Sequence, residues 1–422
     1  MQISATSFET DFNSLPISTF WSNDTEKELK MHKIHAYPAK FRAFLVSKSL
    51  EYARREGVKV RSIADIFCGC GTTALEAKRF KIEFWGCDIN PVATLIAKVK
   101  SEQYNQSILE KYFTRILGAY STQSIGVPEH YRLDKRLNYW FSKAQISDLY
   151  KLLSLIRDVV PKGKYRSFFL CAFSNILKPT SRWLTKSIKP QVDPIKIPEK
   201  VKNAFEKQYH FMLRANQESI GIYTSEIKAR IVNKNFFKVA IDEPFVDLLI
   251  TSPPYVTSYE YADLHQLSTL WLGYTNDYRR LRKGTIGSLH FLNDMKVEVN
   301  SLNEIGLDIY YKMYKIDRTK AKSIAKYFLD IKNAIDKAYF ILNPGALAVV
   351  IIGNTKYINI EVDNAKFLAS CMLTTGFKRI DIFKRKIGPK ILTPYRDSKG
   401  RFSQNANHRK VYSHEFVIIA KK

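Results

Sequence analysis

The sequence contains no long apolar run and few cysteines. No stretch of its 422 residues approaches the roughly 18 consecutive apolar residues that a membrane-spanning helix needs, and no basic amphipathic anchor is visible. The segment Met1–Phe8 lacks the charged and then apolar plan of a signal peptide. Five cysteines are too few for a disulfide framework. We therefore expect a cytoplasmic protein with no membrane partner.

Several motifs of other protein classes are also missing. Cys68 and Cys70 have the spacing of a metal-binding pair, but no second pair of cysteine or histidine residues lies nearby. We read both as small buried residues and predict no metal site. No glycine-rich segment continues into Gly-Lys-Ser or Gly-Lys-Thr, which excludes a P-loop. The chain also shows no internal repeat and no low-complexity tract.

Acidic residues are the scarcer of the two charges. Lys and Arg number 67 against 40 Asp and Glu, which gives a net charge of +27. Such an excess favours a polyanionic partner, because each phosphate that a cation neutralises releases a counterion. Hydrophobic residues make up 45% of the chain, as in a globular protein, and the length allows two domains.

The segment Val246–Tyr255 is the first to indicate a site. Residues 246–250 are mostly apolar and predict a buried strand of a parallel sheet. The strand must end at the Pro-Pro pair that follows, because proline cannot donate a ladder hydrogen bond and fixes its own φ. A stiff loop with Ser252 and Tyr255 would then leave the carboxyl end of a strand, where open α/β sheets bind ligands. A rigid turn after a core strand is the alternative interpretation.

A second segment, Ser62–Ala77, has the pattern of a strand, a glycine turn and a helix. The strand is predicted at 63–67, the turn at Gly69 and Gly71, and the helix from about Thr72. Glycine lets the backbone approach a ligand with no Cβ in the way, and the N-terminus of the helix offers unpaired N–H groups. The full dinucleotide fingerprint is absent, so this pattern alone does not specify a cofactor.

The next unit supports a nucleotide-like cofactor. Lys81–Asp88 predicts a second strand that ends in a carboxylate. In nucleotide-binding α/β units an acidic residue at that place accepts hydrogen bonds from ribose hydroxyls. Asp88 could also cap the helix that starts near Pro91, and the two roles are compatible.

From about 101 to 220 the alternation of strands and helices stops. Apolar residues recur at three- and four-residue steps from Ile146 to Val160, which predicts an amphipathic helix, and Tyr165–Leu177 predicts another. Basic and aromatic residues interleave around these helices, which suits a nucleic-acid groove, although a solvated basic face is the alternative. Including a similar cluster near 280, the cations that we expect to contact nucleic acid are Lys135, Arg136, Arg182, Lys186, Lys189, Arg279 and Arg280.

After the insertion the alternation resumes. We predict a mobile polar stretch up to about residue 320 that closes over the substrate, and residues 1–30 read as a loosely packed lead-in. The last two strands alternate and can form an antiparallel hairpin, joined by a cationic segment at 394–410. The predicted elements are strands at 229–232, 246–251, 346–353, 378–386 and 416–421, and helices at 259–274, 326–341 and 365–374.

Together, Asp65–Thr73 (DIFCGCGTT) and Thr251–Tyr255 (TSPPY) resemble the amino-methyltransferases of DNA, which use S-adenosyl-L-methionine (SAM). Ser-Pro-Pro-Tyr resembles the cytosine-N4 branch in particular. His35–Phe41 resembles the segment that these enzymes use beside the methionine end of the cofactor. The resemblance covers about 35–100 and 229–422. It implies a Rossmann-like α/β fold with a seven-stranded, mostly parallel sheet, a reversed last strand and a helical insertion.

The order of these motifs implies a division of the chain. Residues 31–100 and 221–422 would form one split catalytic domain that binds SAM, and residues 101–220 would be the target-recognition domain. Residues 1–30 would be the lead-in. The resemblance further implies double-stranded DNA as the partner and a nucleoid-associated location. A cognate restriction endonuclease, as in a restriction-modification system, stays an open partner.

The resemblance also implies roles for individual residues. Asp88 would bind the ribose, and an acidic residue often found near the adenine ring is replaced here by Lys234 and Asn235, so no contact by that route is expected. The residues implied around SAM are Lys40, Phe41, Asp65, Phe67, Gly69, Gly71, Thr72, Asp88 and Thr251. The residues implied for catalysis are Ser252, Pro253, Pro254 and Tyr255.

The residue types suit methyl transfer to a base amine. The Ser252 oxygen and the Pro253 carbonyl can accept the two N–H hydrogens of the amine, which would turn its lone pair toward the methyl donor. The base must leave the duplex, and Tyr255 would stack on it. No cysteine follows a proline, so the Pro-Cys nucleophile of carbon-5 cytosine methyltransferases is absent. The alternatives are adenine N6 as the target, an RNA base methyltransferase, and a nucleic-acid-binding protein without the chemistry.

Overall fold

We describe a computed structural model of the chain. It describes residues 2–3, 11–24, 27–38, 40–223, 226–256, 260–288, 298–357, 359–388, 395–396, 402–403, 405, 407, 409–410 and 413–422. The predicted helix start at 259 and most of the predicted connection at 394–410 lie outside the described residues.

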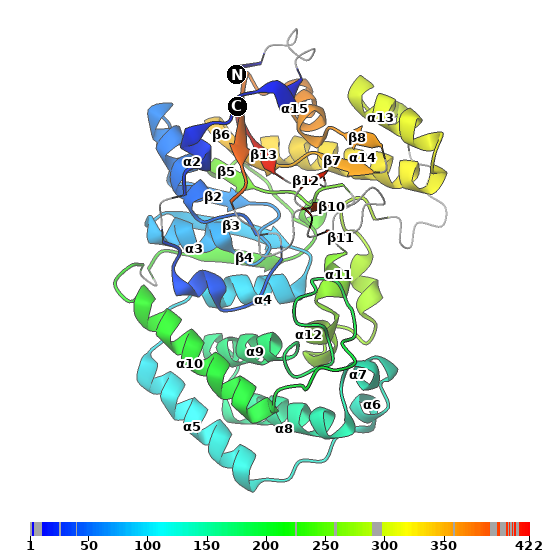
Figure 1. Cartoon of the computed structure of the whole chain (residues 1–422). Coiled ribbons are helices and arrows are strands. Elements are labelled where there is room, and N and C mark those ends of the chain that lie inside the picture. Colours follow the sequence, from blue (N-terminus) through cyan, green and yellow to red (C-terminus); the bar gives the residue numbers. More distant parts are fainter. Residues whose placement is uncertain are drawn as a thin grey trace.

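One large twisted sheet forms the centre of the molecule (Figure 1). Its strand order is β1-β9-β13-β6-β5-β2-β3-β4. From β6 to β4 neighbouring strands run parallel, whereas β13 lies antiparallel to both β6 and β9. The strands are β1 (Gln2–Ile3), β2 (Ser62–Asp65), β3 (Glu83–Asp88), β4 (Ala229–Asn233), β5 (Val246–Thr251), β6 (Leu342–Ile352), β9 (Arg379–Lys386) and β13 (His414–Lys421).

This topology confirms the predicted fold class. Seven strands form a mostly parallel sheet whose last strand in the chain, β13, is reversed, and β1 adds a short edge strand that the sequence did not predict. Two smaller sheets accompany it. They are formed by β7 (Thr355–Tyr357) with β8 (Ile360–Val362), and by β10 (Tyr395–Arg396) with β11 (Phe402–Ser403) and β12 (Arg409–Lys410).

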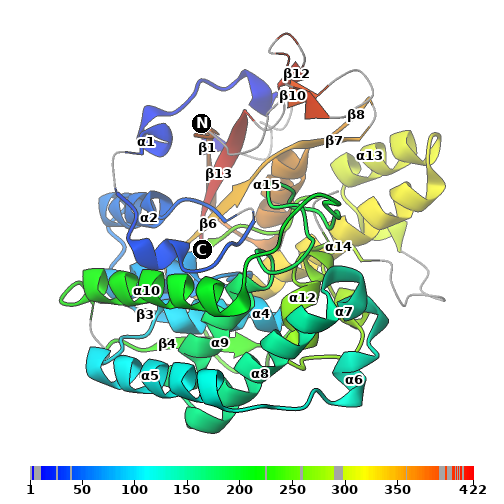
Figure 2. The same cartoon turned by 60° about the horizontal axis from the view of Figure 1, so that its bottom comes forward.

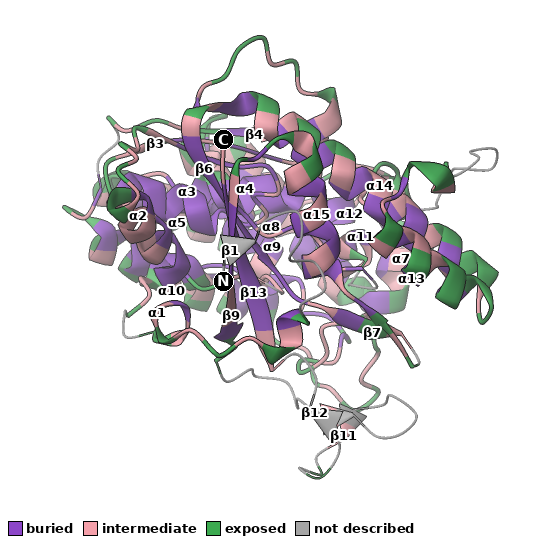
Figure 3. Ribbon diagram, turned by 90° about the horizontal axis from the view of Figure 1, so that it is seen from above, coloured by how far each residue is buried: buried purple, intermediate pink, exposed green. Residues whose placement is uncertain are grey.

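Helices cover both faces of the large sheet, which explains why its central strands β5 and β6 are mostly buried. Along β5, Leu248 and Ile250 pack with one helical layer and Leu249 packs with the other. Figure 3 shows the strands buried between these layers, with exposed residues on the outer helices. The first layer contains α2 (Phe44–Arg55) and α3 (Thr72–Arg79). The second contains α13 (Glu304–Tyr314), α14 (Arg318–Ile341) and α15 (Asn364–Thr375).

The insertion forms a layer of helices beyond α4 (Pro91–Lys100), on the side of the sheet seen in Figure 2. The predicted helices at 146–160 and 165–177 are confirmed as α8 and α9. Ser142 starts α8 through a capping box with Gln145. The insertion helices are α5 (Gln106–Thr122), α6 (Glu129–Arg132), α7 (Lys135–Trp140), α8 (Lys143–Val159), α9 (Lys164–Ile176) and α10 (Val201–Ser219).

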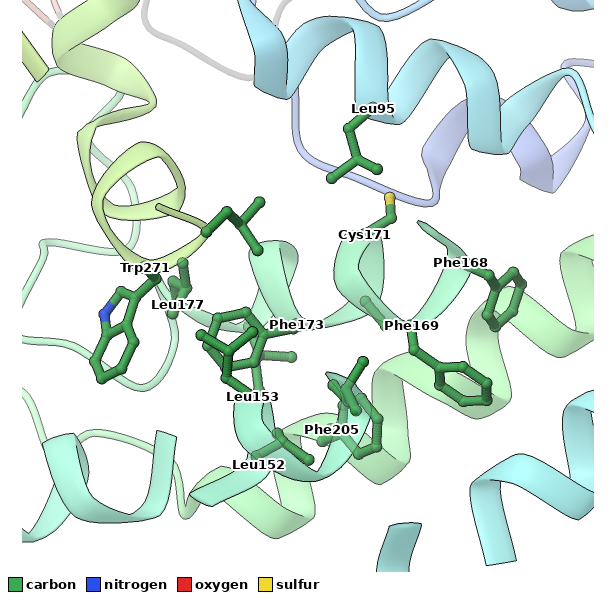
Figure 4. Packing of buried hydrophobic residues seen from close by; sticks show 14 of the residues in the cluster. Leu95, Leu152, Leu153, Phe168, Phe169, Cys171, Phe173, Leu177, Phe205 and Trp271 are labelled. Atoms are coloured by element: carbon green, nitrogen blue, oxygen red, sulfur yellow. The ribbon is translucent and has the colours of Figure 1, made fainter. Parts of the chain in front are cut away.

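The insertion shares one apolar core with the sheet-bearing part of the chain. Leu95 of α4 and Trp271 of α12 (Gln266–Trp271) belong to the same buried cluster as Phe173 and Phe205. Figure 4 shows Leu95 reaching toward Cys171 of α9, with Trp271 at the other side of the cluster. Because this core joins helices from both parts, the insertion is packed against the sheet-bearing part and is not connected to it by linkers alone.

Two predictions about local structure were wrong. The predicted helix at 259–274 is interrupted at His265, between α11 (Tyr261–Leu264) and α12. The polar stretch up to 320 contains α13 and the start of α14, because Asn303 and Asp317 cap these two helices with their side chains.

The lead-in is also packed more tightly than predicted. The side chains of Phe12 and Trp21 are fully buried among residues of the sheet and its helices. Ile17 forms a bridge with Lys384 of β9. Burial of an aromatic side chain stabilises the fold by about 2 kcal/mol. The polar composition of the segment did not reveal this contribution. Across the described residues, every helix is too short or too polar to span a membrane.

Candidate active site

One cavity lies along the carboxyl ends of four neighbouring strands, and we call it the main cavity. Gly69 lines it after β2, Asp88 after β3, Asn235 after β4, and Ser252 after β5. The two loops singled out from the sequence therefore meet across one opening, as the edge rule for parallel sheets predicts. Of the other candidate residues, Lys40, Phe41, Phe67, Thr72 and Pro254 also line this cavity.

The glycine loop after β2 depends on left-handed backbone at two positions. Gly69 has φ +48° and Gly71 has φ +76°. A Cβ on Gly71 would lie 2.7 Å from the Cβ of Ala97 on α4, so no side chain fits there. A Cβ on Gly69 would approach the hydroxyl of Tyr37 at 3.4 Å. Gly71 therefore brings α3 close to α4, whereas Gly69 forms the wall of the cavity itself.

Asp88 joins the ends of β2 and β3. The Gly69 N–H donates to its Oδ2 at 2.9 Å, and the Asn90 N–H donates to its Oδ1 at 2.8 Å. Burial raises the pKa of Asp88 to about 6, although both backbone hydrogen bonds oppose the shift. Each carboxylate oxygen keeps a further lone pair for a ligand hydroxyl. The predicted capping of α4 is done by Asn90, whose side chain accepts from the N–H groups of Val92 and Ala93.

Asp65 lies behind the cavity wall. Its Oδ1 accepts from the Phe67 N–H at 3.1 Å and from the Thr251 hydroxyl at 2.6 Å, and its Oδ2 accepts from the Thr73 hydroxyl at 3.0 Å. Burial raises its pKa to about 6, and these hydrogen bonds counteract the rise. Asp65, Gly71 and Thr251 are absent from the cavity lining, so the structure places these three candidates where they support the loops without facing the opening.

The loop after β5 faces two cavities. Ser252 and Pro254 line the main cavity, and Tyr255 lines a second one, which we call the side cavity. The two cavities share the walls Pro254 and Tyr261, so they adjoin. Pro253 is buried and is absent from both linings. An extended ligand in the main cavity would thus lie next to a ring-sized space beside Tyr255.

Several lining residues were missed by the sequence reasoning. Tyr37 covers Gly69, and burial, followed by the charge of Asp88, raises its pKa well above the usual value. After β4, Phe236 and Phe237 line the main cavity next to Lys234 and Asn235, where the DNA amino-methyltransferases that the sequence resembles often have an acidic residue. The rule that ligands bind at carboxyl strand ends could have predicted this stretch, whereas nothing in the sequence shows that Tyr37 returns to the glycine loop.

The cations that were predicted to contact DNA differ in how accessible they are to a phosphate. Lys135, Arg182, Lys186, Lys189, Arg279 and Arg280 are exposed. Arg279 is paired with Asp277, and Arg182 donates to the Tyr139 carbonyl. A loop with the exposed residues Lys186 and Lys189 thus presents cations that a phosphate could reach.

Arg136 has a different setting. Its Nε donates to the Gln266 side chain at 2.6 Å, and its guanidinium lies 5.1 to 5.5 Å from the ring centres of Tyr139, Trp140 and Tyr278. This half-buried cation joins the insertion to α12. It is therefore less available to a phosphate than its neighbour Lys135, which is exposed.

Comparison with known proteins gives two sequence similarities, and no family model matches the chain. The chain is 22% identical over 437 residues to the type II methyltransferase M.MvaI of Kocuria varians, which covers 94% of this chain and 92% of that protein. It is 32% identical over 96 residues to the type II methyltransferase M.MjaII of Methanocaldococcus jannaschii, covering 22% of this chain and 17% of that protein. The similarity to a type II methyltransferase thus extends over nearly the whole chain.

Among solved structures, the rRNA methyltransferase aviRa from Streptomyces viridochromogenes aligns over 92% of this chain and 88% of that chain. The TM-score is 0.32 and the sequence identity is 10%, values too low to carry an argument.

Within the described residues, no group of three or more His, Cys, Asp and Glu side chains is placed to hold a metal ion.

Proposed function

We propose that this protein is a SAM-dependent DNA methyltransferase that modifies the exocyclic N4 amine of cytosine. The observation that carries the proposal is that Gly69 and Asp88 line the same cavity as Ser252 and Pro254. A donor held by the first pair would face an acceptor held by the second. The similarity to a type II methyltransferase over most of the chain supports the same reaction class.

The residues of the main cavity fit SAM. Asp88 offers free lone pairs to ribose hydroxyls, and Phe236 and Phe237 offer apolar rings to the adenine. Gly69 lets the methionine half approach the backbone closely, and Lys40 lies beside it. When bound, SAM supplies an electrophilic methyl group on a sulfonium. The chain's own residues orient the acceptor and exclude water.

The acceptor amine is a weak nucleophile, because its lone pair is delocalised into the base. The Ser252 oxygen, which lines the main cavity, would accept one of its hydrogens and turn the lone pair toward that cavity. The Pro253 carbonyl would accept the other only after a shift of the loop, because Pro253 lies in neither cavity lining. Such positioning of two reactants supplies most of the acceleration in a direct transfer. Thr251, held by its bond to Asp65, fixes where this loop begins.

The target base has to leave the duplex to reach Ser252. We propose that the extruded base lies in the side cavity. Tyr255 is one wall of this cavity, and Pro254 is shared with the main cavity. The helical insertion at 101–220, with its exposed cations Lys135, Lys186 and Lys189, would hold the flanking duplex as the target-recognition domain. A cognate restriction endonuclease stays a prediction.

The test is transfer of a labelled methyl group from SAM to unmethylated DNA, followed by nucleoside analysis. Label on cytosine N4 supports the proposal. Label on adenine N6 or on RNA alone selects one of the alternatives, and absence of transfer to any nucleic acid with SAM still bound favours a binding protein.

A matched pair of serine variants tests the role of the loop. Ser252→Ala is expected to lose at least a hundredfold in kcat, because it removes an acceptor of the amine hydrogens, and to keep its affinity for SAM. Ser121→Ala on α5, where the exposed hydroxyl bonds only within its helix, is the control. Equal activity of the two variants would contradict the proposed role of Ser252.

A further inference from the structure

The ring of Tyr255 is fixed by residues from the other half of the sheet. We propose that Glu415 and Arg385, a buried charged pair on β13 and β9, are positioning residues for methyl transfer that hold Tyr255 as a rigid wall of the side cavity. This inference rests on the proposed function, since it assigns Tyr255 to the extruded base.

Tyr255 is restrained at its ring and at its hydroxyl, and its side chain also forms a hydrogen bond with Ser252. Its hydroxyl donates to Glu415 Oε2 at 3.0 Å. Its ring lies against Gly353, where an added Cβ would come within 2.9 Å of the Cε2 atom of Tyr255. Burial, and then the neighbouring charge of Glu415, raise the pKa of Tyr255 well above its usual value, so the phenol stays a donor. Tyr255 also lines the side cavity.

Glu415 is itself fixed by Arg385. The two residues are direct cross-strand partners in the register of β13 and β9, and the guanidinium donates to Glu415 Oε1. Arg385 is 3% exposed and Glu415 is 8% exposed. A buried charge without its partner is strongly destabilising, so each of these residues keeps the other in place.

Arg385 is in turn tied to the lead-in. Its Nε donates to the Trp21 carbonyl at 2.8 Å, and its guanidinium lies 5.4 Å from the ring centre of Phe44 on α2. Trp21 is buried against the sheet. A continuous chain of contacts therefore runs from Trp21 through Arg385 and Glu415 to the hydroxyl of Tyr255.

The register of β13 explains why this support reaches the site. Phe416 pairs with Ile352 at the end of β6, so Glu415 lies beside Gly353, the residue on which the ring of Tyr255 rests. A ring already restrained at its edge and at its hydroxyl loses little freedom when a base stacks on it. Pre-organisation of this kind accelerates a reaction by lowering the cost of reaching the productive geometry.

The experiment compares two tyrosines with the same kind of bond. Tyr255→Phe removes the hydroxyl and keeps the ring. Tyr52→Phe is the matched control, because the Tyr52 hydroxyl donates to a carboxylate oxygen of Asp381 on β9 at 2.9 Å, and Tyr52 lines neither cavity. We expect Tyr255→Phe to lower kcat about tenfold with unchanged SAM affinity, and Tyr52→Phe to leave kcat unchanged.

A double variant tests whether Glu415 acts through Tyr255. Glu415→Gln is expected to lower kcat, and combining it with Tyr255→Phe should add little to the larger single effect, since both changes disturb one contact. Additive losses, or equal activities of Tyr255→Phe and Tyr52→Phe in an enzyme that methylates DNA, would overturn the inference.

The two proposals fail separately. A wild-type protein that transfers no methyl group to DNA removes the proposed function, whereas an active wild type with a fully active Tyr255→Phe variant removes only the positioning role. Tyr255→Phe leaves the Glu415–Arg385 pair intact, so the comparison with Tyr52→Phe stands even where Glu415→Gln fails to fold.

Discussion

The two loops that face each other across the main cavity are supported in different ways. The glycine loop after β2 takes its hydrogen bonds from its own neighbourhood in the chain, chiefly from Asp65 and Asp88. The loop after β5 takes its support from distant segments, namely Asp65 through Thr251, and Glu415 through Tyr255. The proposed cofactor side is thus encoded locally, whereas the proposed base side depends on how remote segments of the fold come together.

Asp65 is where the two kinds of support meet. Its carboxylate accepts from Phe67 in the glycine loop, from Thr73 in α3 and from Thr251 at the end of β5. One buried side chain therefore sets the spacing of both loops. Changes to local support should damage folding and cofactor affinity together, and changes to remote support should damage the transfer step alone.

The largest expected effect is that of Gly71→Ala. The added Cβ would collide with Ala97 in a backbone conformation that alanine rarely adopts, so we expect a loss of about 3 kcal/mol or more in the free energy of unfolding, and loss of SAM binding. Gly57→Ala is the control, since Gly57 has a similar φ of +73° in open space. Urea unfolding measures the free energy of unfolding of both variants. Equal stability of the two variants would show that contact between α3 and α4 is unimportant for the glycine loop.

Asp65→Ala should have the next largest effect and should damage both loops. Three donors lose their acceptor in a buried site, so we expect a loss of about 2 to 3 kcal/mol in the free energy of unfolding, with lower SAM affinity and lower kcat. Unfolding, calorimetric titration with SAM and the methyl-transfer assay test the three effects. A variant with normal SAM affinity and reduced kcat would contradict a role of Asp65 in both loops, because the carboxylate would then support the β5 loop alone.

The neighbours Lys135 and Arg136 extend the comparison to the insertion. Arg136→Ala removes a packed cation from a cage of rings and should lower the free energy of unfolding by about 1 kcal/mol. Lys135→Ala should leave stability unchanged and reduce the slope of DNA affinity against salt by about 1. Thermal unfolding and DNA titration at several salt concentrations distinguish the two, and the reverse pattern would contradict these placements.

The smallest expected effect is a pH dependence of SAM affinity. Ribose hydroxyls would donate to the ionised form of Asp88, so binding lowers its pKa from about 6, and affinity should increase with pH up to about 6 and then level off. Asp88→Asn should bind SAM more weakly and lose this dependence. Asp65 titrates in the same range but stays in both proteins, so the difference between them reports Asp88. Parallel pH profiles would contradict the ribose contact.

Prediction from sequence succeeded where the pattern is local. The bounds of β5 and the start of α3 at Thr72 follow from an apolar run ended by prolines and from a glycine turn. It failed where tertiary packing decides. Nothing in residues 1–30 showed that Phe12 and Trp21 would be buried, and α13 was hidden in a polar stretch.

In the candidate site, too, the local patterns were predicted from the sequence and the tertiary contacts were not. The glycine loop and the loop after β5 were found because strand ends of one sheet edge must converge. Tyr37, Phe236 and the link between Tyr255 and Glu415 were not found, because they depend on which loop folds over which and on the register of β13.

The place of β13 has a consequence for synthesis on the ribosome. This late strand is inserted between β6 and β9, both of which emerge earlier, so the sheet stays divided until residues 414–421 have left the exit tunnel. Until then Arg385 has no carboxylate opposite it, and Tyr255 lacks its hydrogen bond to Glu415. Competence for modifying the genome would thus begin only when translation has passed this strand, and a truncated product would stay inert.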